Sequence, residues 1–556
     1  MEPIQQRFPE DNAAAPPNSG ELLATALRSC DQAIAAKPDD PEAYNARGNV
    51  LLRSMRYDDA VASFDKAIEL KPDYPQPYNG RGNALQALRR FEEAVESYDT
   101  AVALKADYAA AYSNRGNALQ ALQRFEDAIE SYGKAIILRP DDVEAYNNRG
   151  AGLRRLARFD EALQDFDSAI ALLPDHAGLH KNRGNALQGL RRFEDAIESY
   201  NTAIALSSHY GDAYDNRGVT QKELKRFDEA MDSFGEALAL RQEHHDAIFN
   251  RALLHLLMGR FEIGWRDCEA RKNTRIPDGN RGWGKPLWLG ETDISGKTIL
   301  VHWEQGFGDV IQMCRYISLL KTAGARVLFL PQQQLQTLMR GLNAYVSIVG
   351  HDSVIPQFID LQCPIMSLPL AFKTDIGSIP SASYISADKG KVAVWKDRLG
   401  SKTKPRVGVV WKGNLVPDGG RSIELERFQR LLNPSLEFIS LQKEVTDAER
   451  SLLDRAGVLH AGDAFADFSD TAALCVLMDL VISIDTSVAH LAGALGIPVW
   501  VLLTWVADWR WLLDRDDSPW YPSMRLFRQT ARGDWNGVLE RVTLELKALN
   551  PPVRSV

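Results

Sequence analysis

The sequence predicts two architectures in one chain of 556 residues: an α-helical solenoid in the first half and an α/β region with two parallel-sheet lobes in the second. In the first half an arginine recurs every 34 residues, a period typical of stacked helical repeats. In the second half, continuous apolar segments lead into polar or glycine-rich turns and then into helices, as in βαβ units. A chain of this length also exceeds what one hydrophobic core can organise, so several domains are expected.

Composition and charge argue against several classes of protein. The net charge of −9 gives no reason to expect a nucleic-acid partner. The five cysteines are scattered without a CxxC pair, which argues against a disulfide framework or a zinc knuckle and fits a reducing cytoplasm. Residues 1–20 lack an apolar signal core and predict a disordered leader, and no apolar run reaches membrane-spanning length. We therefore expect a cytoplasmic protein without a membrane span.

The repeats of the first half share a set of positions. Each has the arginine, then a small residue, an aromatic that opens a second helix, an alanine three residues later, and a second aromatic. The arginines are Arg47, Arg81, Arg115, Arg149, Arg183, Arg217 and Arg251. Six full repeats span residues 41–244, with a half repeat before them (21–40) and a degenerate one after them (245–271). This pattern resembles tetratricopeptide repeats, which are helix-turn-helix units, and predicts an array over residues 21–271.

In the later repeats the residue before the arginine is an asparagine. First helices line the concave surface of such an array, and asparagine offers a donor and an acceptor, so a column of asparagines can bind an extended polypeptide backbone. The column consists of Asn114, Asn148, Asn182, Asn216 and Asn250. It resembles the asparagine ladder of the O-GlcNAc transferase array, which implies a peptide groove. The alternative is that asparagine is merely tolerated on a solvated helix face. For the arginines we expect structural ion pairs with acids such as Asp65, Asp99 and Asp167.

A boundary and a first α/β lobe follow the array. Residues 272–297 are rich in glycine, proline and tryptophan without helical periodicity, which predicts a linker. The first lobe, residues 298–390, opens with a strand, a glycine loop (EQGFGD), a helix and a second strand, as in a βαβ unit. The expected elements are strands at 298–303, 326–330, 346–349 and 358–360, a loop at 304–309 and a helix at 310–323. Residues 368–404 predict a crossover between lobes.

The second lobe, residues 391–556, contains the stretch around which we expect the chain to be organised, residues 479–503. It predicts a buried strand, a polar turn, a helix of small residues and a second buried strand. Free backbone N–H groups at the start of that helix, together with the helix dipole, favour binding of phosphate. The expected elements are strands at 407–411, 437–441, 480–484 and 499–503, and helices at 424–432, 447–456, 488–495 and 532–549.

These motifs resemble those of a known enzyme family. EQGFGD before a helix, VGVVWKGN, SLQKE and ISIDTSVAHLAGALGIPVWVLL resemble the heptosyltransferase-like (family 9) glycosyltransferases. The version fused behind tetratricopeptide repeats is similar to bacterial protein O-glycosyltransferases, including flagellin-modifying ones, and in plan to O-GlcNAc transferase. The resemblance implies a GT-B fold of two Rossmann-like lobes, a nucleotide-sugar co-substrate, no metal cofactor, and a polypeptide acceptor such as flagellin.

The resemblance also implies a catalytic base. An inverting transfer needs a group that deprotonates the acceptor hydroxyl and a means of stabilising the departing diphosphate. In heptosyltransferases the aspartate that closes the glycine loop is the base, and the matching residue here is Asp309. Asp309 with Gln312 also fits an N-cap and capping-box pattern, so a structural role is open as well. Glu304 is the second candidate for the base.

Donor-binding residues are expected in the second lobe. The family motif maps onto Asp485, Thr486, Ser487 and His490, with phosphate at the backbone N–H groups and a hydrogen bond from His490. Lys412 and Arg421 lie in the loop after the first strand, where cations can neutralise a diphosphate. Gln442 and Lys443 lie at a strand end suited to contacts with the base or ribose. The DxD letters in residues 514–517 do not follow a strand, so we interpret them as a surface turn and expect no metal site.

Three functions remain open at this point. The first is a glycosyltransferase that modifies a Ser or Thr hydroxyl of a polypeptide held by the array. The second is a lipopolysaccharide or heptose-type carbohydrate glycosyltransferase whose repeats only dock it to partners. The third is a non-enzymatic scaffold with a degenerate transferase region. The intact glycine loop, Asp309 and the DTSVAH sequence disfavour the third, and the asparagine column favours the first over the second.

Overall fold

The computed structural model describes residues 19–274, 283–342, 346–350, 358–413 and 420–548. It divides the chain into two compact units, Met1–Gln242 and Glu243–Val556. The predicted leader lies almost entirely outside the described residues, as do residues 275–282 of the predicted linker and residues 414–419 of the predicted loop at 412–421. No helix in the described ranges is long and apolar enough to cross a membrane.

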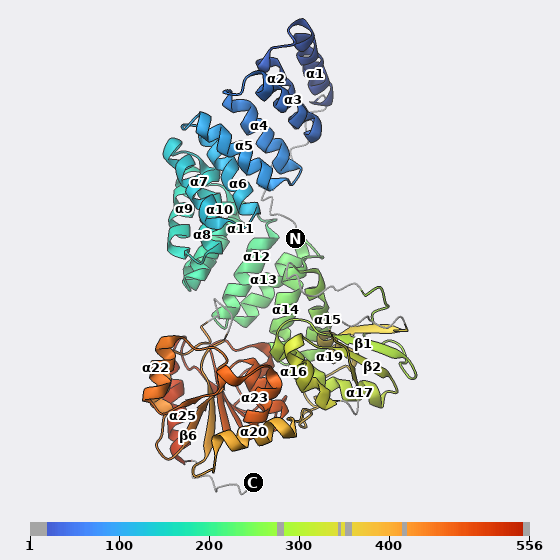
Figure 1. Ribbon diagram of the computed structural model, residues 1–556, viewed down its shortest axis with the longest axis vertical. Helices are drawn as coiled ribbons and strands as arrows, with labels where there is room; N and C mark the ends of the chain where they lie inside the picture. Colours follow the sequence, from blue (N-terminus) through green and yellow to red (C-terminus); the bar gives the residue numbers. More distant parts are fainter. Residues whose placement is uncertain (1–18, 275–282, 343–345, 351–357, 414–419, 549–556) are drawn as a thin grey trace. The chain divides into compact units, whose positions relative to one another are not determined.

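The first unit is a row of helix hairpins, drawn in blue to green in Figure 1. From α2 onward, a first helix of 13 residues alternates with a second helix of 14 residues. The helices are α1 (Ser19–Ala36), α2 (Pro41–Arg53), α3 (Tyr57–Leu70), α4 (Pro75–Ala87), α5 (Phe91–Leu104), α6 (Ala109–Ala121), α7 (Phe125–Leu138), α8 (Val143–Arg155), α9 (Phe159–Leu172), α10 (Ala177–Gly189), α11 (Phe193–Leu206), α12 (Gly211–Glu223) and α13 (Phe227–Leu240). The period in the sequence is thus the length of one hairpin with its turns, as predicted.

The small residue after each arginine makes room for the second aromatic of the repeat. A Cβ atom added at Gly82 would lie 2.5 Å from a ring carbon of Tyr98, and one at Gly116 would lie 2.6 Å from a ring carbon of Tyr132. Both tyrosines are buried. Because protein interiors are close-packed, even one extra methyl group at these positions would displace the ring. The small residue and the aromatic therefore depend on each other.

Six of the seven repeated arginines form structural ion pairs, as predicted. The pairs with the expected acids are Arg81–Asp65 (2.6 Å), Arg115–Asp99 (2.5 Å) and Arg183–Asp167 (2.6 Å). In one repeat Gly133 replaces the preceding acid, and Arg149 instead forms a bidentate ion pair with Asp165. The last arginine of the series, Arg251, likewise pairs with a following acid, Asp267, whereas the remaining repeats have serine at that position. The acid has thus moved to the opposite side of the arginine while the ion pair is kept. Because the ordinary acids are half exposed, each such pair stabilises the array by only about 0–1 kcal/mol.

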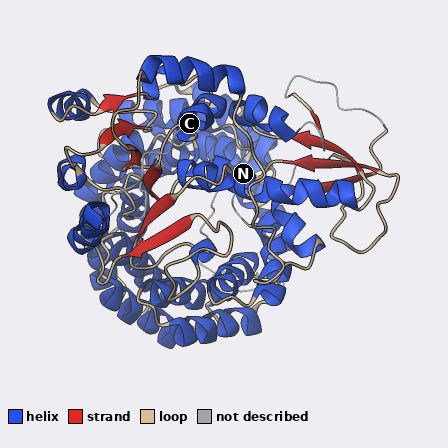
Figure 2. Ribbon diagram, turned by 90° about the horizontal axis from the view of Figure 1, so that it is seen from below, coloured by secondary structure: helices blue, strands red, loops and turns tan. Residues whose placement is uncertain are grey.

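The second unit contains two all-parallel sheets, seen as two separate groups of strands in Figure 2. The smaller sheet has the strand order β3-β2-β1-β4, and the larger one the order β10-β9-β8-β5-β6-β7. The strands are β1 (Thr298–His302), β2 (Arg326–Leu330), β3 (Ser347–Ile348), β4 (Leu361–Pro364), β5 (Arg406–Val410), β6 (Glu437–Ser440), β7 (Leu459–His460), β8 (Leu480–Ile484), β9 (Val499–Leu503) and β10 (Met524–Arg528). The predicted α/β architecture with parallel sheets is confirmed. Since the strands of each sheet are parallel, their carboxyl ends share one edge, where ligands of such sheets bind.

Helices connect and cover these strands. The α-helices are α14 (His245–Leu257), α15 (Phe261–Cys268), α16 (Phe307–Met313), α17 (Ile317–Thr322), α18 (Gln336–Met339), α19 (Leu368–Ala371), α20 (Lys389–Leu399), α21 (Leu425–Phe428), α22 (Asp447–Arg455), α23 (Phe468–Cys475), α24 (Ser487–Ala494) and α25 (Trp535–Ala548). The 3-10 helices are η2 (Glu269–Asn273), η3 (Cys314–Tyr316), η4 (Gln333–Leu335), η5 (Arg340–Leu342), η6 (Ile365–Ser367), η7 (Gln429–Leu431), η8 (Gly462–Ala464) and η9 (Trp509–Trp511). The pair α14–α15, which the sequence places at the end of the array, belongs to this second unit.

Several predicted elements differ from the structure. The strand expected at 358–360 is wrong, because the strand there is β4, which ends on Pro364. Proline argues against a central strand, but β4 is the last strand of its sheet, where it pairs with β1 and has an isolated bridge from Gln362 to Leu287 on its other side. The helix expected at 310–323 is α16, η3 and α17 in succession. The sequence also missed α20, α23 and β10; α20 buries only Trp395 and therefore lacks an apolar stripe.

The closing helix α25 packs against the larger sheet. Trp535, Val538 and Val542 of this helix join a buried cluster with Ile482 of β8 and Trp500 of β9. The strands that lead into the site described next are therefore fixed from the side of α25.

Candidate functional site

The amino ends of α16 and α24 meet in the second unit. A Cβ atom added at Gly308, the second residue of α16, would lie 3.0 Å from His490 Cδ2 and 3.6 Å from Ser487 Cα at the start of α24. The glycine loop after β1 and the polar turn after β8 therefore come together. The amino end of a helix has backbone N–H groups without partners inside the helix, and such groups favour an anion.

Asp309 lies at this junction. It is the third residue of α16, and its Oδ2 accepts a hydrogen bond of 2.7 Å from the backbone N–H of Gly306, the N-cap residue. Its other oxygen, Oδ1, forms an ion pair with Arg510. The predicted capping box is therefore wrong in its register: Gly306 is the N-cap residue, and Asp309 occupies the third helical position that was expected for Gln312. Gln312 is buried and accepts a hydrogen bond from Arg510 instead.

Arg510 is the main residue of the site that the sequence analysis missed. It lies on η9 in the segment after β9, and its guanidinium contacts three side chains. Nε donates to Gln312 Oε1 at 2.6 Å, one terminal nitrogen donates to Asp508 at 2.6 Å, and the other pairs with Asp309. The guanidinium also lies over the ring of Trp509, 4.3 Å from its centroid. The available signal was an arginine between tryptophans beyond the carboxyl end of a strand next to β8.

The carboxylates around Arg510 have perturbed acidities. Burial raises the pKa of Asp309, and the Arg510 charge opposes that rise. Burial and the charge of Asp508 raise the pKa of Asp485 to about 6, against the opposing charges of Arg510 and Arg421. Both carboxyl groups therefore hold a proton more readily than exposed aspartates do, which suits a group that must accept one.

The turn after β8 leaves the start of α24 without a side-chain cap. Thr486 is the N-cap residue, but its hydroxyl lies 3.0 Å from Ser483 Oγ and makes no hydrogen bond to the helix. The predicted phosphate-binding residues Asp485, Thr486 and Ser487 thus precede or begin the helix as expected. Because no side chain caps them, the first N–H groups of α24 remain suited to a phosphate.

His490 is held rigidly one turn into α24. Its ring stacks on Trp511 with centroids 5.3 Å apart, and Nδ1 lies 3.0 Å from the Tyr521 hydroxyl. Burial and the charges of Arg510 and Arg315 keep the pKa of His490 well below its usual value, so the imidazole is neutral at pH 7. We assign the ring proton to Nε2, since Nδ1 can accept from Tyr521; Nε2 lies 3.9 Å from Asp485.

The remaining predicted donor residues divide into two groups. The Lys412 ammonium is paired with Glu449 at 2.5 Å, and its backbone N–H donates to Gln442 Oε1 at 3.3 Å. These contacts stabilise the ends of β5 and β6. Arg421, in contrast, is the loop cation whose charge lowers the pKa of Asp485. The charge of Arg421 therefore acts on the turn before α24, while the charge of Lys412 is neutralised by its ion pair with Glu449.

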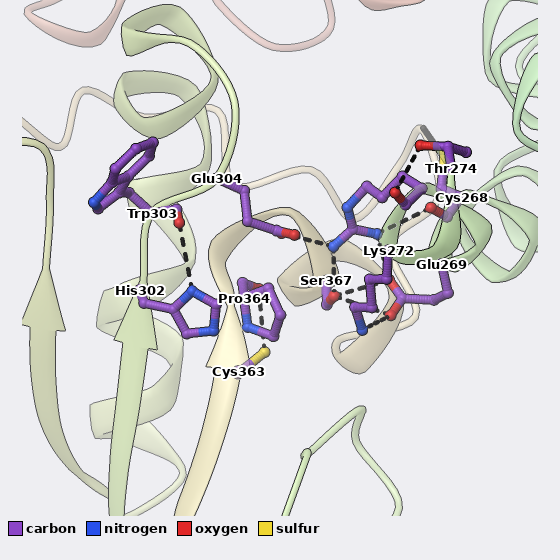
Figure 3. Close-up of polar contacts among 11 residues, drawn as sticks. Cys268, Glu269, Lys272, Thr274, His302, Trp303, Glu304, Cys363, Pro364 and Ser367 are labelled. Carbon is purple, nitrogen blue, oxygen red and sulfur yellow. Dashed lines mark hydrogen bonds and ion pairs between the residues drawn. The ribbon is translucent and has the colours of Figure 1, made fainter. Parts of the chain in front are cut away.

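Glu304, the second candidate for the base, lies in a buried polar cluster (Figure 3). Its carboxylate is 1% exposed and bonds to Arg271 at 2.7 Å, and Arg271 also donates to Ser367 at 2.8 Å. Burial raises the pKa of Glu304, and Arg271 opposes that rise. Asp309 keeps 16% of its side chain exposed, so an acceptor hydroxyl can approach Asp309 more directly than Glu304. Through its ion pair with Arg271, Glu304 connects the glycine loop to η2.

The asparagine column is bonded between repeats. The amide donors and their acceptors in the preceding repeat are Asn114 to Asn79 (3.0 Å), Asn148 to Asn117 (3.0 Å), Asn182 to Asn147 (2.8 Å) and Asn216 to Asn185 (2.9 Å). Asn182 is buried and the other three donors are partly exposed, so most of the column remains accessible to solvent. Asn250 lies on α14 in the second unit. A carboxamide has two N–H donors and an acceptor oxygen, so one bond of this kind leaves capacity for a ligand.

A second set of asparagines pairs with buried tyrosines. The hydroxyls of Tyr98, Tyr132 and Tyr200 donate to the asparagine two residues after the arginine, at distances of 2.7–2.8 Å; these are Asn83, Asn117 and Asn185. Where the repeat has Phe166 or Phe234 instead, that position holds Ala151 or Val219. This pairing shows that part of the asparagine pattern serves buried hydroxyl groups, because a buried hydroxyl without a partner is costly.

Comparisons with known proteins agree with the repeat pattern. Family models described as tetratricopeptide repeat match residues 109–142, 143–176 and 181–242, and one described as TPR repeat matches residues 56–88 and 90–123. The chain is 27% identical over 323 residues to Protein FlbA of Caulobacter vibrioides, a match that covers 52% of this chain and 53% of FlbA. The chain thus spans about half the length of this curated relative. The first unit carries tetratricopeptide repeats, as the sequence predicted.

Several solved structures are similar to part of the chain. YrrB, whose title calls it a TPR protein with an unusual peptide-binding site, is 23% identical with a TM-score of 0.31, covering 34% of this chain and 98% of YrrB. MamA from Desulfovibrio magneticus RS-1 is 20% identical with a TM-score of 0.30, covering 31% of this chain and 96% of MamA. A tetratricopeptide repeat protein from Parabacteroides merdae is 17% identical with a TM-score of 0.38, covering 43% and 94%.

Proposed function

We propose that the chain is a metal-independent, inverting glycosyltransferase with a GT-B fold, which moves a sugar from a nucleotide donor to a Ser or Thr hydroxyl of a polypeptide. The observation that carries the proposal is the position of Asp309 beside the uncapped amino end of α24. A carboxylate next to a phosphate-binding helix end is the arrangement that a base and a leaving-group site require. The two parallel-sheet lobes and the resemblance of the sequence motifs support the same proposal.

In the proposed reaction Asp309 removes the proton from the acceptor hydroxyl. The oxygen attacks the anomeric carbon of the sugar, and the bond from that carbon to the nucleoside diphosphate breaks. Burial helps Asp309 as a base because it raises the pKa of the carboxyl group. The first N–H groups of α24 stabilise the negative charge that develops on the diphosphate.

Other residues bind and orient the donor. The neutral His490 presents Nε2–H toward the turn, where it can donate to a phosphate or sugar oxygen. Asp485 and Thr486 shape that turn, and Arg421 supplies positive charge near it. Gln442 and Lys412 act indirectly, by holding the loop after β5.

For the acceptor we propose a polypeptide bound along the asparagine column, flagellin being one such chain. The hydrogen bonds between repeats bear on this proposal, because they give the asparagines a structural reason to be present. A carbohydrate acceptor, with the repeats used only for docking, therefore remains the second candidate function. A scaffold without activity is the third.

Nucleotide binding followed by turnover tests the proposal. All 12 tryptophans lie in the second unit, from Trp265 to Trp535, so tryptophan fluorescence reports on that unit alone. At least one of the nucleotides UDP, GDP, ADP and CMP should raise the melting temperature of the second unit, each being tested with and without EDTA. No shift with any of them, in folded protein, would favour the scaffold.

The second step uses the matching nucleotide sugar. Asp309→Asn should lower its turnover at least about 100-fold without weakening nucleotide binding, because a general base contributes to the chemical step. Asp508→Asn is the matched control, since it also removes a carboxylate partner of Arg510 and should cost far less. Normal turnover by Asp309→Asn would exclude Asp309 as the base.

A further inference from the structure

We propose that Arg510 is a positioning residue shared by the base and the leaving group: it holds Asp309 and offers its remaining N–H groups to the diphosphate of the donor. The proposal rests on the proposed function and adds a residue that none of the sequence motifs contains. It is argued from the contacts of the guanidinium.

The guanidinium is fixed in one orientation. Arg510 is 8% exposed, and Gln312, which accepts from its Nε, is fully buried. The ring of Trp509 covers one face of the guanidinium, and Trp265 of α15 packs edge-on against Trp509 at 5.2 Å. A side chain held in this way loses little conformational entropy when it binds a ligand.

Two of the five N–H groups of the guanidinium are not used by the described residues. An arginine has five N–H donors, one on Nε and two on each terminal nitrogen. Gln312 takes the first, Asp508 takes one of the second nitrogen and Asp309 takes one of the third. One donor on each terminal nitrogen therefore remains, and the terminal N–H groups of a guanidinium form the fork that binds phosphate oxygens in pairs. Gln312 Nε2, also buried, has no partner among the described residues.

The location of the guanidinium fits a diphosphate. The ion pair with Asp309 places the Arg510 guanidinium at the amino end of α16. The charge of Arg510 acts on both Asp485 and His490 at the start of α24. A phosphate bound at that helix end thus lies within the field of Arg510. The charged groups around the site are Asp309, Asp508, Asp485, Arg421 and Arg315.

This arrangement predicts that Asp309 and the diphosphate compete for the charge of Arg510. When a diphosphate binds to the guanidinium, the positive charge of Arg510 stabilises the Asp309 carboxylate less. The carboxylate then becomes a stronger base, so that donor binding prepares the proton transfer. Conversely, removing the charge of Asp309 should strengthen diphosphate binding, and should do so most where Arg510 is present, because the released guanidinium then binds the diphosphate instead.

Isothermal titration calorimetry with inorganic pyrophosphate in EDTA tests the proposal on the full chain. Arg510→Ala should weaken binding at least about tenfold, because a charge-assisted hydrogen bond is lost. Millimolar guanidinium chloride should restore part of the lost affinity of Arg510→Ala. Arg510→Lys keeps the charge without the fork, so its affinity should lie between those of the wild type and Arg510→Ala. Arg515→Ala is the matched control: Arg515 lies five residues away and pairs only with the exposed Asp517. It should bind like wild type.

A double-mutant cycle separates a positioning role from a structural one. Asp309→Asn should tighten pyrophosphate binding about 3–10-fold in the wild type, and much less in the Arg510→Ala background. Equal tightening in both backgrounds, or Arg510→Ala binding within twofold of wild type with unchanged tryptophan fluorescence, overturns the proposal. If Arg510→Ala does not fold, Arg510→Lys decides, and unweakened binding there overturns it.

The proposed function and this inference can fail independently. A chain that binds pyrophosphate as expected but transfers no sugar from any nucleotide donor refutes the transferase and leaves the anion site. A transferase that depends on Asp309 but binds pyrophosphate normally without Arg510 refutes only the role of Arg510.

Discussion

The close approach of α16 and α24 can be tested by adding a single methyl group. In Gly308→Ala the new Cβ would lie 3.0 Å from His490 Cδ2, whereas ordinary contacts are 3.4–4 Å, so one side must move by a few tenths of an ångström. The His490 ring cannot yield easily, because it stacks on Trp511 and lies within hydrogen-bond distance of Tyr521. We therefore expect α16 to move away from α24, at an overpacking cost of about 1–3 kcal/mol.

A matched control isolates that cost from helix propensity. Gly390 is also the second residue of its helix, α20, and alanine favours either helix by up to about 1 kcal/mol. A Cβ at Gly390 would meet only the exposed Asp388 carboxylate, at 3.2 Å. Gly308→Ala should accordingly be less stable than Gly390→Ala by about 1–3 kcal/mol, the overpacking term alone.

The assay is urea unfolding followed by tryptophan fluorescence, which reports only on the second unit. The same two variants are titrated with a nucleotide that the wild type is found to bind, and Gly308→Ala alone should lose affinity, because the amino end of α24, the proposed phosphate site, and Asp309 move apart. Equal stability of the two variants together with unchanged affinity would refute the contact between the helices, and with it the construction of the site.

Three further predictions address the site, the array and the unit boundary. Burial and Asp508 raise the pKa of Asp485 to about 6, so its ionisation lowers the stability of the folded unit above that pH and has no effect below about pH 4. Asp485→Asn should therefore stabilise the second unit by about 2–3 kcal/mol at pH 7.5 and not at pH 4, and an equal effect at both would contradict this. In the array, Asp165→Ser should lower the free energy of unfolding by about 1–3 kcal/mol, as followed by circular dichroism. Adding Gly133→Asp should restore the lost stability, because it gives Arg149 an acid at the position where most repeats have one; no restoration would show that the two positions cannot replace each other. A chain beginning at Glu243 should keep the native tryptophan spectrum, whereas one beginning at Lys272 should lose it with Trp265 and Arg271, which contact Trp509 and Glu304; equal spectra would show that α14 and α15 are dispensable.

The parts of the fold that the sequence predicted are those that depend on local patterns. The repeat array follows from a period that each hairpin satisfies within its own 34 residues, and β1, β8 and β9 are continuous apolar runs between turn signals. The elements it missed lack such a pattern. β10 is a short segment in which two arginines interrupt the apolar residues without regular alternation, and α20 buries a single tryptophan, so neither is distinguishable from a loop before its neighbours are known.

The site divides in the same way. Asp309, Asp485 and His490 could be predicted because each lies within a motif of a few residues. Arg510 could not, because its partners Asp309 and Gln312 lie about 200 residues earlier, in the other lobe. The same reason left Glu304 open as a base, since only the folded chain brings Arg271 to it.

One long-range relationship could nevertheless have been recognised in the sequence. In each repeat the arginine has an acid sixteen residues before it or sixteen after it, and the exchange of Gly133 with Asp165 is visible in the repeat alignment. Arg217 is the exception: it has Asn201 and Ser233 as partners, and burial without an acid lowers its pKa. The periodicity of a repeat thus predicts contacts across a fixed spacing, whereas a site assembled once, from two lobes, has no second copy in the chain against which its pairing can be compared.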